Sequence, residues 1–377
     1  MNSKNLLCLA IALLMFPQIA QTLYSPALAD IGQAFAVEPQ KAVQMLSVYF
    51  LAFAVGVVVW GRMCDRIGRR VAMLAGLALY ASATLLGLNV STFSGLLIAQ
   101  ALAAFGAAVG SVVTQTVLRD RFKGAELAQV FSIMGIALAA SPAIGLFSGT
   151  SLVQAFGYRG VLGCLLGLSV GLWLWCLRTL PETRPADLNT PALFETLWRM
   201  LRDKDIWRST LLVALFNIAL FSYYSVGPFQ FQRLGLSAQW FGYSGVILAL
   251  GSGLGAWLNK RLLQRGFSGG ELVRLAALLT LSGGIGVRLL QDSELFVLAM
   301  LVVVLAFGMA IPNLLGAALR NYSDRLGTAG ALFGLLYYLL IGSGLILVGW
   351  AQALGESLVL CGIIAVVLVG LPGRRKA

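Results

Sequence analysis

The stretch Gly61-Arg62-Met63-Cys64-Asp65-Arg66-Ile67-Gly68-Arg69-Arg70 lies between two long apolar segments and indicates the fold of the chain. It places one aspartate among four arginines within ten residues, so ion pairs are expected around the carboxylate. Gly61 and Gly68 permit backbone conformations and close approaches that a side chain would prevent. The stretch predicts a tight, charged turn between two buried helices.

Apolar segments like the two that flank this turn recur along all 377 residues. A helix of roughly 20 apolar residues crosses the hydrocarbon core of a bilayer. The chain contains twelve such segments, near residues 6–28, 42–61, 71–90, 94–117, 127–150, 158–179, 210–231, 239–262, 271–290, 294–316, 327–350 and 357–372. We expect the first, which ends near Ala27-Leu28-Ala29, to be retained as a span and not cleaved as a signal peptide.

The sequence therefore predicts an all-α membrane protein with twelve transmembrane helices in two pseudo-symmetric six-helix bundles. One charge-rich interruption is long enough to join the bundles. The expected parts are an N-terminal bundle (1–180), a cytoplasmic central loop (181–208) and a C-terminal bundle (209–377). The run 190–208 within the loop is compatible with a short helix on the membrane surface.

Composition supports this class: 59% of residues are hydrophobic, 11% are charged, and the net charge is +12. A soluble domain carries roughly 25% charged residues. The positive charges lie between apolar segments and form no basic face, so nucleic acid is not an expected partner. Histidine is absent, and the five cysteines are scattered without a CxxC pair, so neither a histidine relay nor a metal site is expected.

Orientation follows from the positive-inside rule. With the N-terminus inside, 23 of the 27 basic residues fall in inside loops and 4 fall outside. Adding or removing one span would reverse the side of every later loop. We therefore expect a multi-pass protein of the bacterial inner membrane with both termini in the cytoplasm.

The 61–70 turn resembles the signature loop of the major facilitator superfamily. Within that superfamily, the segment Gln21–Ile31, the pair Arg119-Asp120 and the segment Leu180–Arg184 resemble the Bcr/CflA-type drug-resistance transporters. The resemblance is clear over residues 18–184 and thin in the second half. It implies the major facilitator fold, with alternating access to the two sides of the membrane.

The resemblance also implies gating roles. Asp65, Arg69 and Asp120 would form a charge cluster at the cytoplasmic mouth that latches the two halves together in the outward-open state. The cluster would break when the cavity opens inward, so its pairs are expected to be exposed and modest. Pro142 and Gly145 would belong to a partial antiporter motif in the fifth span, where proline bends the helix and glycine accepts a neighbouring helix. The full set of predicted gating residues is Gly61, Asp65, Arg66, Gly68, Arg69, Arg119, Asp120, Pro142 and Gly145. Gln100 replaces an arginine that many proton-linked relatives carry in the fourth span.

Polar side chains at membrane depth are costly, which makes each one a candidate for facing the transported compound. Substrates in such folds bind near the middle of the membrane, between the halves. The candidates are Gln18, Gln21, Tyr24, Gln44, Tyr49, Thr114, Gln115, Asn217, Phe221, Tyr223, Tyr224, Asn313, Tyr337 and Tyr338. This set offers amides, hydroxyls and aromatic faces but no charge, which favours a bulky lipophilic or amphipathic substrate. Packing between helices is the alternative role for each.

An ion gradient is the expected energy source, because the chain has no GxxxxGK phosphate-binding loop. Proton antiport is implied mainly by the resemblance. Asp30, at the outer end of the first span, is the best-placed proton-carrying carboxylate, and its alternative role is that of a helix-end residue.

The function expected from the sequence is proton-driven export of lipophilic drugs or toxic amphipathic compounds. Export of an endogenous metabolite, such as a siderophore or an amino-acid derivative, remains the alternative. We expect no enzymatic activity and no cofactor. The expected partners are a small-molecule substrate, the proton gradient and the lipid bilayer, and the chain is expected to be a monomer.

Overall fold

The computed structural model describes residues 3–185 and 192–370, all of them helical or in connecting loops. Predictions for residues 186–191 and for the basic residues 374–376 lie outside this range. The chain divides into two compact units, residues 1–191 and 192–377, which are described separately below. The division falls within the charge-rich segment that separates the two sets of apolar helices.

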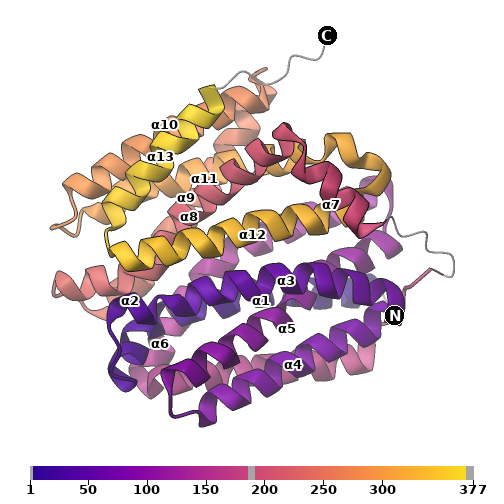
Figure 1. Cartoon of the computed structure of the whole chain (residues 1–377), viewed down its shortest axis with the longest axis horizontal. Coiled ribbons are helices and arrows are strands. Elements are labelled where there is room, and N and C mark those ends of the chain that lie inside the picture. The colour runs from indigo at the N-terminus through magenta and orange to yellow at the C-terminus, as the bar shows by residue number, and fades with distance from the viewer. Residues whose placement is uncertain (1–2, 186–191, 371–377) are drawn as a thin grey trace. The chain divides into compact units, whose positions relative to one another are not determined.

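The first unit contains α1 (Ser3–Ala34), the short α2 (Pro39–Ala42), α3 (Gln44–Ile67), α4 (Arg69–Asn89), α5 (Phe93–Arg121) and α6 (Gly124–Thr179) (Figure 1). The α6 helix is interrupted at Gly157, whose φ of 64° and ψ of −167° lie outside helical geometry. Its two parts therefore correspond to the predicted spans 127–150 and 158–179. Pro142 lies within the first part, which stays helical through it.

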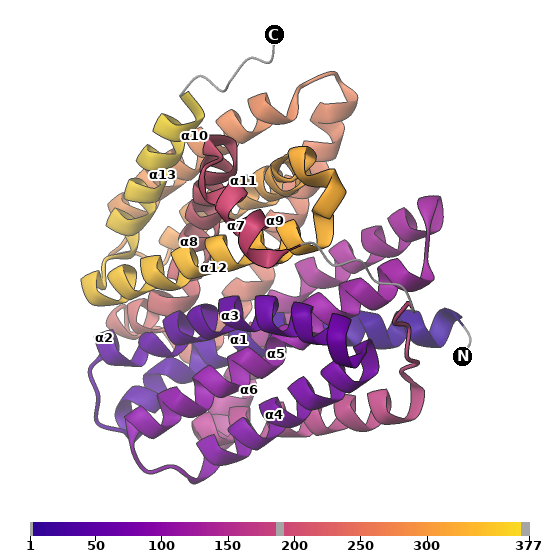
Figure 2. The same cartoon turned by 45° about the vertical axis from the view of Figure 1, so that its right-hand side comes forward.

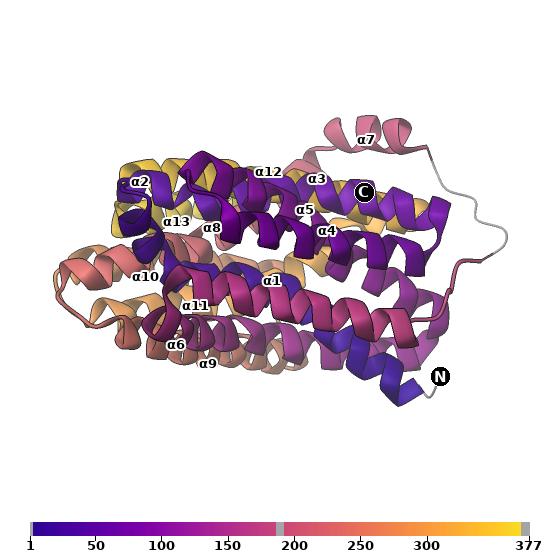
Figure 3. The ribbon, with the colours of Figure 1, turned by 90° about the horizontal axis from the view of Figure 1, so that it is seen from below.

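The second unit contains α7 (Leu193–Leu201), α8 (Lys204–Arg233), α9 (Ala238–Gln264), α10 (Gly269–Leu289), α11 (Phe296–Ala318), the 3₁₀ turn η1 (Arg320–Arg325), α12 (Leu326–Ala351) and α13 (Leu354–Gly370) (Figure 2). The α7 helix forms the short element that the run 190–208 allowed (Figure 3). Its residues Phe194 and Trp198 are exposed, 83% and 58% respectively, and lie one helical turn apart.

Ten helices of the described residues are long and apolar enough to cross a membrane. One of them is the interrupted α6, which supplies two spans, and α13 is a shorter apolar helix. These elements account for the twelve predicted spans.

The two units repeat one packing scheme. In the first, α3 and α4 both pack on α5, and α4 and α1 pack on α6. In the second, α9 and α10 both pack on α11, α10 packs on α13 and α8 packs on α12. Glycines allow the equivalent close contacts: a Cβ at Gly56 would meet the carbonyl oxygen of Phe105, and one at Gly255 would meet that of Leu305. Each unit is therefore a six-span bundle with the same helix neighbours.

Candidate functional site

The turn between α3 and α4 is built around Gly68. This residue has φ 100° and ψ 156°, a conformation that L side chains rarely adopt. A Cβ at this position would also collide with the carboxylate of Glu182. Glycine is therefore required both by the backbone and by the group packed against it.

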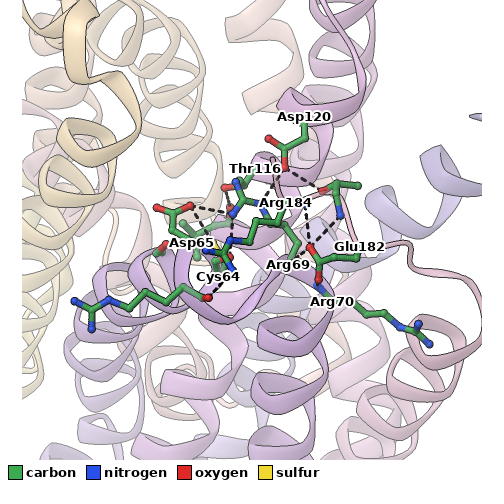
Figure 4. A network of polar contacts seen from close by, with 12 residues as sticks. Cys64, Asp65, Arg69, Arg70, Thr116, Asp120, Glu182 and Arg184 are labelled. Carbon is green, nitrogen blue, oxygen red and sulfur yellow. Dashed lines mark hydrogen bonds and ion pairs between the residues drawn. The ribbon is translucent and has the colours of Figure 1, made fainter. Parts of the chain in front are cut away.

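Arg69, the first residue of α4, lies at the centre of a polar cluster within the first unit (Figure 4). Its Nη1 is 3.1 Å from Asp65 Oδ1 and its Nε is 2.9 Å from Asp120 Oδ2. Nη1 also donates a hydrogen bond to the carbonyl oxygen of Cys64. One guanidinium thus joins the end of α3 to the end of α5.

Glu182 binds the N-terminus of α4 from a segment far along the chain. Its carboxylate accepts hydrogen bonds from the backbone N–H groups of Arg69 and Arg70, at 2.9 and 3.1 Å. It also accepts from the N–H groups of Thr183 and Arg184. Since the first N–H groups of a helix have no partner within it, Glu182 serves as the cap of α4.

Partial burial alone would raise the pKa of Glu182, but these four backbone N–H donors hold it below its ordinary value. The carboxylate therefore stays ionised over the physiological range. Thr183 Oγ1 also donates to Asp120 Oδ2, and Arg184 Nη1 donates to the carbonyl oxygen of Arg66. The cluster consequently fastens the segment after α6 to the ends of α3, α4 and α5.

The burial of this cluster differs from expectation. The side chain of Arg69 is 2% exposed, whereas Asp65 and Asp120 are 26% and 15% exposed. The Arg69 guanidinium turns toward the Cys64 carbonyl, Asp65 and Asp120, which bond to it within the unit. Its pairs are therefore less exposed than the sequence predicted, and breaking one of them would leave a buried charge without a partner.

The other predicted gating residues lie around or apart from this centre. Arg66 is exposed, and the carbonyl oxygen of Gly61 accepts from the Cys64 thiol. Arg119 lies over the ring of Phe131, 5.7 Å from its centroid, and takes no part in the ion pairs described for Arg69. On α6, a Cβ at Gly145 would collide with Thr22 of α1, so this glycine does form a contact face for a neighbouring helix.

Several candidate substrate residues of the first unit bond to one another or to the backbone. Gln21 Nε2 donates to Gln18 Oε1 at 3.0 Å, and Tyr49 OH donates to the carbonyl oxygen of Pro17 at 2.8 Å. Gln115 makes a weaker bond to Ser111 at 3.4 Å. The remaining candidates of this unit are the buried Tyr24 and Thr114 and the exposed Gln44.

Gln100 is fully buried, and neither of its amide atoms has a hydrogen-bond partner among the described residues. The Oγ1 atom of Thr114, on the same helix, is likewise buried without a partner there. An unpaired buried amide is costly, so α5 carries polar groups that its packing alone does not explain.

The candidates of the second unit separate into packing and stacking groups. Tyr223 OH forms a 2.5 Å hydrogen bond with Ser244 Oγ and is fully buried, which joins α8 to α9. The rings of Phe221 and Tyr224 meet edge to face with their centroids 5.5 Å apart. The ring centroids of Tyr337 and Tyr338 lie 4.3 Å apart. Two amides remain: Asn217 donates to Val213 O, and Asn313 Nδ2 donates to Asn259 Oδ1 at 2.6 Å.

Asp30 lies beside the interruption of α6. Its Oδ2 atom accepts a 2.6 Å hydrogen bond from the backbone N–H of Tyr158, the first residue after Gly157. A Cβ at Gly157 would lie 3.1 Å from the same oxygen. Asp30, a residue of α1, thus caps the second part of α6, a different helix from the one whose end the sequence considered.

Sequence analysis missed the capping role of Glu182. The segment Leu180–Arg184 carries part of the resemblance described above, but nothing in it distinguishes Glu182 from the other four acids of residues 181–208. Its partners lie 113 and 112 residues away, and no local pattern connects them.

Comparison with known proteins places this geometry in a family. The sequence profile described as Major Facilitator Superfamily matches residues 9–345. The chain is 29% identical over 357 residues to "Multidrug resistance protein D" of Escherichia coli, covering 92% of this chain and 88% of that protein. It is 22% identical over 332 residues to "Bicyclomycin resistance protein homolog" of Haemophilus influenzae, covering 85% and 82%.

A crystal structure of a D-xylose–proton symporter superimposes with a TM-score of 0.75 at 13% identity, over 97% of both chains. At this identity the match bears on the fold alone. The predicted fold and the Bcr/CflA-type resemblance are both confirmed by these comparisons.

Proposed function

Because the chain belongs to the Major Facilitator Superfamily, we propose that this multi-pass transporter exports lipophilic or amphipathic toxic compounds from the cytoplasm in exchange for protons. The observation that carries the proposal is the likeness to a multidrug resistance protein over 92% of the chain. We place the protein in the bacterial inner membrane as a monomer, with both termini in the cytoplasm.

The chemistry of the candidate residues supports a lipophilic substrate. Aromatic pairs such as Phe221–Tyr224 and Tyr337–Tyr338 offer large apolar faces, and amides such as Asn217 add single polar contacts. Few directional contacts and much aromatic area favour recognition of varied amphipathic molecules. A substrate with several charges would meet no charged partner in this set.

The cluster around Arg69 supports a mechanical role. It fastens the cytoplasmic ends of α3, α4 and α5 and the segment after α6 into one block. A rigid block transmits the movement of a whole bundle during alternating access without bending its helices. We propose that the signature turn contributes to gating in this way, and not through pairs that break in each transport cycle.

Transport into everted membrane vesicles tests this function. Vesicles that contain the chain are expected to accumulate lipophilic dyes and drugs when respiration acidifies their lumen, and to lose them when the gradient is collapsed. Vesicles without the chain are the control. Gradient-driven uptake of a polar siderophore or amino-acid derivative, with no uptake of lipophilic compounds, would replace drug export with metabolite export.

An Asp30→Asn variant tests the proposed proton carrier in the same assay. Asparagine caps a helix about as well as aspartate, so the bond to Tyr158 and the thermal stability are expected to persist. Loss of gradient-driven uptake at unchanged stability would assign proton transfer to Asp30. Uptake at the wild-type level would restrict Asp30 to its capping role.

A further inference from the structure

A cavity of about 1110 Å³ lies within the second unit, at the end where α8 and α10 begin and α9, α11 and α13 finish. None of the predicted substrate residues except Asn313 lines it. By the charge distribution of the loops, this is the cytoplasmic end of the bundle. The cavity therefore needs an explanation separate from the transported compound.

Three arginines from three different elements converge on the cavity: Arg208 of α8, Arg274 of α10 and Arg320 of η1. The lining contains one acid, Asp205, which leaves an excess of two positive charges. In the part of the chain that the structure describes, neither Arg208 nor Arg320 forms an ion pair. Their charge is therefore available to an anion.

The beginning of α10 borders the same cavity. Ser268 closes a capping box with Glu271, and Gly269 and Gly270 complete this part of the lining. The first N–H groups of a helix have no partner within it and favour negative charge nearby. The carboxylate of Glu271 already occupies this helix end, so the positive charge on this side of the cavity comes from the arginines.

The rest of the lining is apolar. Leu212, Leu263, Val273, Leu314 and Val369 contribute carbon surface from all five helices. A small inorganic ion would gain nothing from such a surface, whereas an anion with a hydrocarbon part would bury it there. The lining therefore matches a molecule with a phosphate at one end and acyl carbons at the other.

The positive-inside rule alone predicts positive charge at this end of the bundle. It does not explain why three arginines converge on one cavity. Arg261 and Arg265 occupy the neighbouring end of α9 and are absent from the lining, and Arg261 lies over the ring of Trp257 at 5.2 Å. The arginines at this end are thus divided between those that face the cavity and those that do not.

We propose that this cavity binds an anionic phospholipid of the inner leaflet. The arginines hold the phosphate, and the leucines and valines hold the glycerol and first acyl carbons. The site shares no residue with the proposed gating cluster of the first unit, and its binding is measured without any transport assay.

Thermal unfolding of the full-length chain in detergent tests the proposal. Phosphatidylglycerol is expected to raise the unfolding midpoint at lower concentration than phosphatidylcholine does. Each of the variants Arg320→Gln and Arg208→Gln is expected to need about five-fold more phosphatidylglycerol for the same shift, since a basic residue contributes about that factor toward an anionic lipid. Arg265→Gln, which removes a charge from outside the lining, is the matched control.

Arg208 also donates to the carbonyl oxygen of Val369, so its variant changes a structural contact as well. The exposed Arg320 has no such contact among the described residues, and its variant therefore decides the result. Equal responses to phosphatidylglycerol and phosphatidylcholine would overturn the site. An Arg265→Gln variant that needs as much additional phosphatidylglycerol as Arg320→Gln does would overturn it too. A midpoint shift of the same size with inorganic phosphate alone would overturn its assignment to a lipid.

Discussion

At the start of α4, Arg69 places its guanidinium between two carboxylates that come from different helices. Replacing it with glutamine leaves Asp65 and Asp120 without their shared cation and removes the donor to the Cys64 carbonyl. Breaking a buried pair in this way costs about 3 kcal/mol or more. We therefore expect Arg69→Gln to lower the free energy of unfolding in detergent by about this amount.

Arg66→Gln is the matched control for Arg69→Gln, because Arg66 is exposed in the same turn and its contact to Arg184 uses only its backbone. Its effect should stay within about 0.5 kcal/mol. Equal effects of the two substitutions would show that the cluster contributes nothing beyond surface charge.

The lowered pKa of Glu182 predicts that the stability of the folded chain depends on pH. Because its pKa is lowered in the folded state, its contribution is fully present above the unfolded value near 4.5 and is lost as pH falls through the folded value. The free energy of unfolding of the wild-type chain is therefore expected to exceed that of the Glu182→Gln variant by a constant margin from pH 8 to about pH 5. The margin should shrink below about pH 4.5.

Unfolding midpoints across this pH range check the Glu182 prediction, with Glu126→Gln as a control. Glu126 is an exposed acid in the first turn of α6. If Glu182→Gln tracked the wild type at every pH, the carboxylate would not be the cap that its four N–H contacts indicate.

At the scale of elements, the contact between α1 and α6 depends on small residues. A Cβ at Gly145 would collide with Thr22, whereas one at Gly135 of the same helix would meet nothing within 4 Å. Overpacking of such a contact costs about 1–3 kcal/mol. We expect Gly145→Ala to destabilise the first unit by this amount and Gly135→Ala to be neutral or slightly stabilising.

The measurement is the unfolding midpoint of each alanine variant. Both variants make the same substitution on the same helix, so their midpoints differ only through the surroundings of the two glycines. A destabilisation by Gly135→Ala as large as that by Gly145→Ala would show that the contact with Thr22 does not determine the result, because helix propensity favours alanine over glycine at both positions.

The sequence predicts the membrane-spanning helices because each of them is an apolar segment of bilayer length. The interruption of α6 was visible as a gap between two such segments, and Gly157 lies within it. The contacts of Glu182 and the convergence of Arg208, Arg274 and Arg320 were not visible, because they join helix ends that are remote in sequence. Burial of Arg69 was also missed, since composition predicts that an arginine in a turn faces water.

At the scale of the molecule, both units use the same helix neighbours although their sequences resemble each other little. This agreement arises because close helix contact requires small residues only at a few positions, such as Gly56 and Gly255. A bundle can therefore keep its architecture while its polar residues diverge. The first unit accordingly carries the Arg69 cluster and the second the arginine-lined cavity.

The central claim is that proton flow through this chain drives a lipophilic compound across the membrane. Reconstituting the purified full-length chain into liposomes with an acidic lumen tests it most directly. We predict that a lipophilic cationic dye accumulates in the lumen while protons leave it, and that both fluxes stop when an ionophore removes the pH gradient. Dye movement that is indifferent to the gradient, or absent for folded protein across a panel of amphipathic compounds, would contradict the account.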